Sequence, residues 1–320
     1  MAKNSFPEAM PNPAVGAILV HNNSIIAEGY TSAYGGAHAE VNCIVFAKAN
    51  TPQLIAESTL YVTLEPCSHY GKTPPCADLV IASGIKRVLI GTIDPHSKVA
   101  GKGIQKLMEA GIDVTVGILE KECMAVNARF FTYHEKKRPY IILKWAETQD
   151  GFIAPKHKEE QKPVWITNTA SRQLVHKWRS QEQAILIGGK TAIDDNPSLT
   201  TRDWHGASPI RIVLDTRGNL PASLKVFDDT AKTIKLATAN PAEICDSVYA
   251  EGIQSVVIEG GAQTLQKFID ANLWDEARVF KGVHYMQEGI KAPAIASRAI
   301  VAQTQNIQGD VLTTFNNPTS

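Results

Sequence analysis

The strongest constraint on this chain is a set of three metal-ligating side chains that lie far apart in the sequence. His38 stands in a His-Ala-Glu triplet, Cys67 follows Pro66, and Cys76 follows after eight intervening residues. One imidazole and two thiolates form a ligand set that zinc accepts, and catalytic zinc sites keep their fourth position for water. One ion can hold these groups only in a fold that brings both segments together. The sequence therefore predicts a zinc site formed by His38, Cys67 and Cys76.

Glu40 lies two residues beyond His38 and is the predicted catalytic group. From a helix start its carboxylate could reach a water molecule at the metal without being a ligand. Zinc lowers the pKa of such a water towards about 7, and the carboxylate could pass its proton to a leaving amine. His-x-Glu followed by Pro-Cys and a second cysteine is the signature of zinc deaminases, in which two residues usually separate the cysteines. We therefore predict a zinc-dependent deaminase of a nucleobase-like ring.

The remaining cysteines are Cys43, Cys123 and Cys245, and we expect them in the core or at inert surface positions. An odd total of five cysteines does not suggest a disulfide framework. A purely structural zinc would normally have four protein ligands, so the three-ligand set favours a catalytic ion.

Composition narrows the class of protein. With 320 residues the chain can form two domains, each with its own core. The formal net charge is zero, which gives no electrostatic footprint for a polynucleotide backbone. The N-terminus lacks the apolar segment of a signal peptide, and no stretch is long and apolar enough to span a bilayer. We expect a cytoplasmic protein that binds neither nucleic acid nor membrane.

Apolar periodicity predicts alternating strands and helices before residue 135. A hairpin turn is expected at 21–23. The alternation implies an α/β layer in which the later strands are largely parallel. Strands are expected at 14–20, 24–28, 59–63, 87–91 and 113–116, and helices at 38–49, 74–83, 101–110 and 120–134.

A domain boundary is expected at the run Glu-Lys-Lys-Arg-Pro, residues 135–139. It combines charge with a proline that disfavours helix just before it. A second strand-helix unit follows this run. Its strands are expected at 140–145, 184–187, 210–214, 233–237, 255–258 and 276–280, and its helices at 170–179 and 263–271.

Several motifs together resemble those of the bifunctional deaminase/reductase family of riboflavin biosynthesis. They are Pro-Asn-Pro-Ala-Val-Gly at 11–16, His-Ala-Glu-Val at 38–41, the cysteine loop within 61–76, Asp-Pro at 94–95 and Val-Ala-Gly-Lys-Gly at 99–103. The long cysteine loop separates this family from cytidine and tRNA adenosine deaminases. The resemblance implies an α/β protein with a cytidine-deaminase-like three-layer domain at 1–137 and a dihydrofolate-reductase-like domain at 138–320.

The resemblance also implies what each domain does. The first domain would deaminate a pyrimidine that carries ribose 5-phosphate, with one zinc ion, and would contact this small-molecule substrate through Asn12, His69 and Lys72. An ammonium such as that of Lys72 suits a phosphate as a point charge. The second domain would use NADPH to reduce the ribosyl group of the product to ribityl. A homo-oligomer, a dimer or larger, is implied as well.

For the second domain, the resemblance assigns contacts with the cofactor and with the substrate. A glycine pair at a strand-to-helix junction lets a phosphate approach the helix N-terminus, although such glycines also simply make tight turns. The G-x-G-x-x-G fingerprint is missing, which argues against a Rossmann fold. Cofactor contacts fall on Trp165, Thr191, Asp195, Gly260 and Gly261, and substrate contacts on Lys144, Thr167, Arg179, Leu199, Arg202 and Glu259.

Two alternatives stay open from the sequence. One is a zinc deaminase of another base, such as cytidine or tRNA adenosine, with an unrelated C-terminal unit. The zero net charge and the long cysteine loop argue against it. The other is a catalytically silent zinc-binding module, against which the presence of Glu40 beside three ligands speaks.

Overall fold

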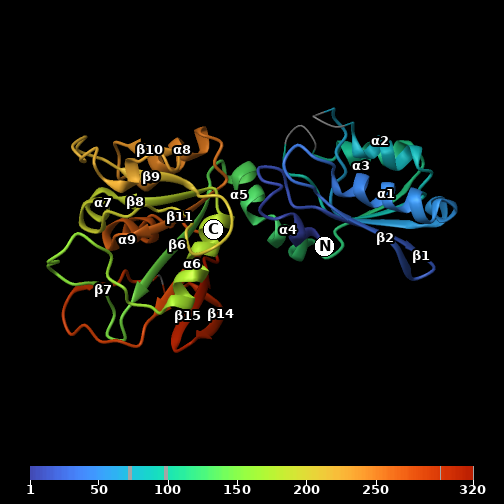
Figure 1. The fold of residues 1–320 in the computed structure, drawn as a ribbon. Helices are drawn as coiled ribbons and strands as arrows, with labels where there is room; N and C mark the ends of the chain where they lie inside the picture. Colours follow the sequence, from blue (N-terminus) through green and yellow to red (C-terminus); the bar gives the residue numbers. More distant parts are fainter. Residues whose placement is uncertain (71–73, 97–99, 296, 320) are drawn as a thin grey trace. The chain divides into compact units, whose positions relative to one another are not determined.

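The computed structural model describes residues 1–70, 74–96, 100–295 and 297–319. The chain divides into two compact units, Met1–Lys136 and Lys137–Ser320. The blue-to-green part of Figure 1 is unit 1, and the green-to-red part is unit 2. This division lies one residue from the expected boundary between residues 137 and 138. Within the described residues, no helix is long and apolar enough to cross a membrane.

Unit 1 is built around a five-stranded sheet. Its strands are β1 (Gly16–His21), β2 (Ser24–Tyr30), β3 (Thr59–Leu64), β4 (Arg87–Thr92) and β5 (Asp113–Val116). The spatial order is β2-β1-β3-β4-β5. β1 pairs antiparallel with β2 and β3, whereas β3, β4 and β5 run parallel. The expected hairpin and the parallel later strands are therefore confirmed.

Helices cover both faces of this sheet, which makes three layers. α1 (Ala39–Asn50), α2 (Cys76–Ala82) and α3 (Lys102–Glu109) lie on one side, and α4 (Glu120–Val126) lies on the other (Figure 1). The contact with α4 is tight, because a Cβ at Gly91 of β4 would lie 2.3 Å from the Cys123 sulfur. Short 3-10 helices are η1 (Ala2–Ser5) and η2 (Pro52–Glu57).

The single helix expected at 120–134 is wrong. It is interrupted at Asn127, and α5 (Ala128–Lys136) follows as a separate helix. The buried Asn127 amide accepts a hydrogen bond from the Ala14 N–H at 2.7 Å and donates one to the Ala14 carbonyl at 3.0 Å. This pairing joins residues that are 113 positions apart in the sequence. The helix is therefore interrupted by a tertiary contact, which the local apolar periodicity could not predict.

Unit 2 contains an eight-stranded sheet. Its strands are β6 (Tyr140–Glu147), β8 (Ala184–Gly188), β9 (Ile210–Leu214), β10 (Thr233–Leu236), β11 (Ser255–Gly260), β12 (Glu276–Lys281), β14 (Ile300–Ile307) and β15 (Asp310–Asn316). The order is β10-β9-β8-β11-β6-β12-β15-β14. The first six strands are parallel, and β15 and β14 are antiparallel additions at one edge. All six expected strands of this unit are present.

The helices of unit 2 connect the parallel strands. They are α6 (Thr169–Gln181), α7 (Gly189–Asp195), α8 (Pro241–Ala250) and α9 (Ala262–Asp270), with the short η3 (Lys225–Phe227). β7 (Phe152–Ala154) and β13 (Ile290–Lys291) form a separate two-stranded ribbon. Asn168 caps α6 by accepting a hydrogen bond from the Ser171 N–H, as expected for a helix start. The core includes Trp274 and Phe268, both almost fully buried.

Candidate functional sites: a metal centre and a cavity

The three predicted zinc ligands of unit 1 come together. Nδ1 of His38 lies 3.6 Å from the Cys67 sulfur and 3.3 Å from the Cys76 sulfur. All three ligand atoms lie within 4.8 Å of one another. Tetrahedral zinc, with bonds of about 2.3 Å to sulfur and about 2.0–2.1 Å to nitrogen, would separate such atoms by about 3.6 Å. The residues therefore fit a zinc ion, as the sequence predicts.

Two helix starts present these ligands. His38 is the N-cap residue of α1, and Cys76 is the first residue of α2. Cys67 lies in the segment after β3, and its sulfur accepts a hydrogen bond from the Cys76 N–H at 3.3 Å. The positive end of a helix dipole favours a negatively charged group such as a thiolate. The local geometry thus supplies both position and electrostatic support for metal binding.

Electrostatics within the cluster favour an anionic sulfur at Cys67. The pKa of the Cys67 thiol lies below its usual range, because the Cys76 thiol donates a hydrogen bond to its sulfur. That bond raises the pKa of Cys76, which is the donor. Hydrogen bonding to Cys67 also raises the pKa of His38.

Glu40 lies beside the ligands without being one of the three. Its side chain is hydrogen-bonded to that of Cys76, and the residue is only 3% exposed. Burial raises the pKa of Glu40 to about 7. A group with such a pKa can both take up and release a proton near neutral pH.

A buried carboxylate fixes the segment that leads to Cys67. Glu65, two residues before Cys67, is 4% exposed. Its two oxygens accept four backbone N–H hydrogen bonds, which tie the end of β3 to the start of α3. The donors are Asp94, Gly101, Gly103 and Ile104, at 2.8–3.3 Å.

The substrate residues predicted in unit 1 are Asn12, His69 and Lys72. Asn12 is half-buried, and His69 is exposed. Lys72 lies outside the described residues. A substrate role for these three stays a prediction. The cysteines outside the cluster, Cys43, Cys123 and Cys245, are free and buried.

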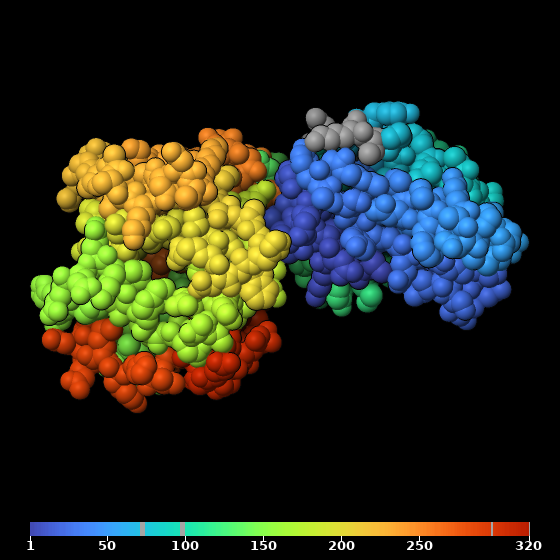
Figure 2. Space-filling model, in the orientation of Figure 1, coloured from blue at the N-terminus to red at the C-terminus, as the bar shows by residue number. Residues whose placement is uncertain are grey.

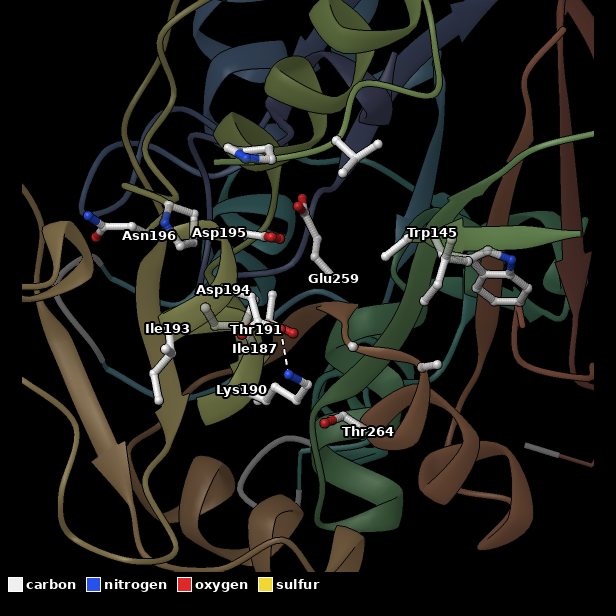
Figure 3. A pocket seen from close by; sticks show the side chains of 18 of the residues that line it. Trp145, Ile187, Lys190, Thr191, Ile193, Asp194, Asp195, Asn196, Glu259 and Thr264 are labelled. Carbon is white, nitrogen blue, oxygen red and sulfur yellow. Dashed lines mark ion pairs between the residues drawn. The ribbon is translucent and has the colours of Figure 1, made fainter. Parts of the chain in front are cut away.

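Unit 2 holds a cavity of about 1230 Å³ at the carboxyl ends of its parallel strands. Figure 2 shows the surface of this unit hollowed, and Figure 3 shows residues that line the cavity. Ligands of open parallel sheets bind at such strand ends. Of the eleven residues predicted to contact cofactor or substrate, Gly260 does not line the cavity. The other ten do: Lys144, Trp165, Thr167, Arg179, Thr191, Asp195, Leu199, Arg202, Glu259 and Gly261.

Three charged side chains, Lys144, Arg179 and Glu259, lie together in the lining of this cavity. Arg179 donates to both carboxylate oxygens of Glu259, at 3.2 and 2.8 Å. Burial alone would raise the pKa of Glu259, but the charges of Arg179 and Lys144 lower it to about 2. Burial lowers the pKa of Lys144. The guanidinium of Arg179 is thus engaged by Glu259, whereas Arg202 is exposed.

The expected cofactor residues lie on neighbouring elements. Gly261 is the N-cap of α9, and a Cβ there would lie 3.1 Å from the Thr191 hydroxyl of α7. The turn therefore brings two predicted cofactor residues together, with a helix N-terminus that suits a phosphate. Asp195 ends α7 and forms an ion pair with Lys158. Trp165 is 59% exposed.

The cavity lining also includes residues that were not predicted, among them Lys158, Arg172 and His176. Arg172 lies over the Trp165 ring, 5.1 Å from its centre. A signal was available for two of them, because Arg172 and His176 stand four residues apart and Arg179 follows three later, which places all three on one helix face.

Each unit matches a known protein family. The family described as the cytidine and deoxycytidylate deaminase zinc-binding region matches residues 1–92, and the RibD C-terminal domain matches residues 139–282. The riboflavin biosynthesis protein RibD of Aquifex aeolicus is 36% identical over 323 residues, which cover 94% of this chain and 89% of that protein. The chain belongs to the RibD family. RibD of Bacillus amyloliquefaciens is 37% identical over 324 residues, 93% of this chain and 85% of that protein.

Solved structures agree over both units of this RibD chain. A diaminohydroxyphosphoribosylaminopyrimidine deaminase/5-amino-6-(5-phosphoribosylamino)uracil reductase from Thermotoga maritima is similar with a TM-score of 0.88 and 35% identity, over 98% of this chain and 95% of that one. RibD of Acinetobacter baumannii has a TM-score of 0.87 and 30% identity, with the same coverage.

Family membership decides between the hypotheses drawn from the sequence. The chain is a riboflavin biosynthesis enzyme, a deaminase and a pyrimidine reductase in one polypeptide. The expected fold, a cytidine-deaminase-like domain followed by a RibD-type, dihydrofolate-reductase-like domain, is confirmed. The alternative of an unrelated C-terminal unit is wrong, because the reductase family matches that unit.

Proposed function

We propose that this enzyme deaminates a phosphoribosylamino-pyrimidine and then reduces the ribosyl group of the product to ribityl with NADPH. The deamination would belong to residues 1–137 and the reduction to residues 138–320. One observation carries the proposal. A His38, Cys67 and Cys76 cluster beside buried Glu40 occurs in the same chain as a 1230 Å³ cavity lined by the expected reductase residues.

In the deaminase half, His38, Cys67 and Cys76 would hold zinc. When bound, zinc supplies the Lewis acidity that makes water a nucleophile at neutral pH. Glu40 would accept the proton of the attacking water on its carboxylate and deliver it to the departing amine, as its pKa of about 7 allows. Asn12, His69 and Lys72 would contact the substrate, with Lys72 as the cation for its phosphate.

In the reductase half, the cavity would hold the cofactor beside the pyrimidine. NADPH supplies a hydride when bound, while the protein orients both partners. Trp165, Thr191, Asp195 and the glycine turn at 260–261 would contact the cofactor. The substrate would lie against the charged side of the cavity. It would contact Thr167, Leu199 and four charged side chains, Lys144, Arg179, Arg202 and Glu259.

Proton delivery is the chemical task left to these side chains. Reduction of the sugar carbon requires a proton in addition to the hydride. Lys144 is suited to donate it, because burial lowers its pKa and so eases loss of the proton. Glu259 stays ionised beside Lys144, since its pKa is lowered to about 2.

The deaminase assignment is tested with Glu40→Gln, which keeps the shape of the side chain and removes its basicity. We expect ammonia release from the pyrimidine phosphate to fall at least about a hundredfold, in line with loss of general acid–base catalysis. NADPH oxidation on separately supplied deaminated product should stay at the wild-type rate, and NADH should replace NADPH poorly. Ammonia release that survives the substitution would contradict the role of Glu40.

We further propose that the enzyme acts as a cytoplasmic homo-oligomer. Support comes from β14, an edge strand of the sheet in which Ile300 and Val301 are each 56% exposed. Exposed apolar residues on a sheet edge favour pairing with another strand. Light scattering that gives the mass of one chain at micromolar concentration would contradict the oligomer.

A further inference from the structure

One face of α6 carries three basic side chains that all contact the same short segment. Arg172, His176 and Arg179 are spaced by four and three residues, so they project from one side of the helix. The segment is 200–203, which has no regular secondary structure and follows Leu199 into the cavity wall. A segment without backbone ladder bonds needs side-chain contacts to hold its shape.

The two outer side chains attach the ends of this segment. Arg172 Nε donates to the Asp203 carboxylate at 2.7 Å. Arg179 Nη1 donates to the Thr200 carbonyl at 3.3 Å, while its other donors bond Glu259. The segment is therefore connected at one end to the aromatic-stacked Arg172 and at the other to the charged group of the cavity.

His176 holds the middle of the segment. Its side chain is 2% exposed, and its Nδ1 accepts a hydrogen bond from the Arg202 N–H at 3.0 Å. Its Nε2 lies 3.7 Å from the Asp203 carboxylate. An acceptor at Nδ1 requires the tautomer that carries its proton on Nε2, towards Asp203.

The ring is neutral at physiological pH. Burial, together with the nearby charge of Arg179, lowers the pKa of His176 to about 4. The carboxylates of Asp203 and Glu259 oppose this shift and the charge of Arg202 adds to it. A neutral ring keeps Nδ1 available as an acceptor throughout the range in which the enzyme works.

We propose that His176 is a positioning residue of the reductase, which fixes the backbone at Arg202 so that its guanidinium faces the phosphorylated substrate. The Arg202 side chain does not fix its own position, because it is exposed and its guanidinium donates a 3.3 Å hydrogen bond to the Thr200 hydroxyl of the same segment. This inference rests on the proposed function, in which Arg202 contacts the substrate.

The test compares His176→Leu with His176→Asn in the full chain, because the Asn amide oxygen can replace Nδ1 as the acceptor and Leu cannot. For His176→Leu we expect the KM for the deaminated pyrimidine phosphate to rise about tenfold, the effect of one lost buried hydrogen bond. kcat and the KM for NADPH should change less than threefold. His176→Asn should restore most of the loss, and ammonia release by the same chain should be unchanged.

Ser171→Ala is the matched control on the same helix. The Ser171 side chain is buried and donates to the Asp310 carboxylate at 2.7 Å, away from the 200–203 segment. This variant should lower the melting temperature without raising the KM. The inference is overturned if His176→Leu has a wild-type KM, or if Leu, Asn and the Ser171 control raise it equally. A wild-type chain that does not reduce the pyrimidine phosphate would overturn the proposed function, and this inference with it.

Discussion

Gly103 has no room for a side chain, which makes it a probe of how the metal ligands are held. A Cβ at this position would lie 1.9 Å from the carbonyl oxygen of Pro66, the residue that precedes Cys67. Cβ contacts below 3.0 Å are essentially never found, so Gly103→Ala must move one of the two segments by about 1.1 Å or more.

A shift of this size exceeds what the site tolerates. Metal–ligand distances hold to within about 0.2 Å, and a displacement of about 1 Å in an active site can cost about a hundredfold in rate. The four N–H bonds to Glu65 oppose a compensating movement of α3. We therefore expect Gly103→Ala to lower ammonia release about a hundredfold and to weaken zinc binding.

The assay measures zinc per chain after dialysis, together with ammonia release from the pyrimidine phosphate. Reduction of supplied product by the same protein reports that unit 2 is intact, and thermal unfolding reports on unit 1. Lys102→Ala, an exposed neighbour on the same helix, is the matched control. Full zinc content with ammonia release within threefold of wild type, in a folded variant, would refute this reasoning.

Three further outcomes are expected. Asn127→Ala leaves both backbone groups of Ala14 unpaired in a buried site, which should lower the unfolding free energy by about 2–4 kcal/mol in urea titrations; the exposed Asn50→Ala should change it by less than about 0.5 kcal/mol. Removal of zinc by a chelator should stop ammonia release and leave NADPH oxidation intact, and loss of both would contradict separate sites. The folded pKa of Glu259 is depressed from 4.5 to about 2, so the stability it contributes is present above pH 4.5 and is lost as the pH falls towards 2. The stability gap between wild type and Glu259→Gln should therefore narrow in that window, and a constant gap would disprove the linkage.

Local patterns predicted much of the fold and the metal site. Most strands, and helices such as α6 and α9, follow apolar periodicity, whereas α7 and α8 were not predicted. The three zinc ligands stand in two short motifs, each of which can be recognised within a few residues. His38 and Cys76 were expected at helix starts, and both are found there. Features that depend on a few neighbouring residues, such as helix starts and ligand motifs, were therefore predicted well.

Long-range pairing could not be predicted in the same way. Nothing near Asn127 shows that it pairs with Ala14, and Arg179 is 80 residues from Glu259. The strands β14 and β15 were also missed, because β14 is exposed along nearly its whole length and has no apolar alternation. Their turn carries a weak sequence signal, Gly309, because a two-residue hairpin turn needs positive φ and both Gln308 and Gly309 adopt it.

The division of the chain has a consequence for how its two reactions depend on one another. Glu40 and the metal ligands all come from one unit, and the described cavity lining comes entirely from the other. Two inactive chains, one with a defective metal centre and one with a blocked cavity, would thus complement each other when mixed. The intermediate would only have to diffuse from one molecule to the next for the whole conversion to return.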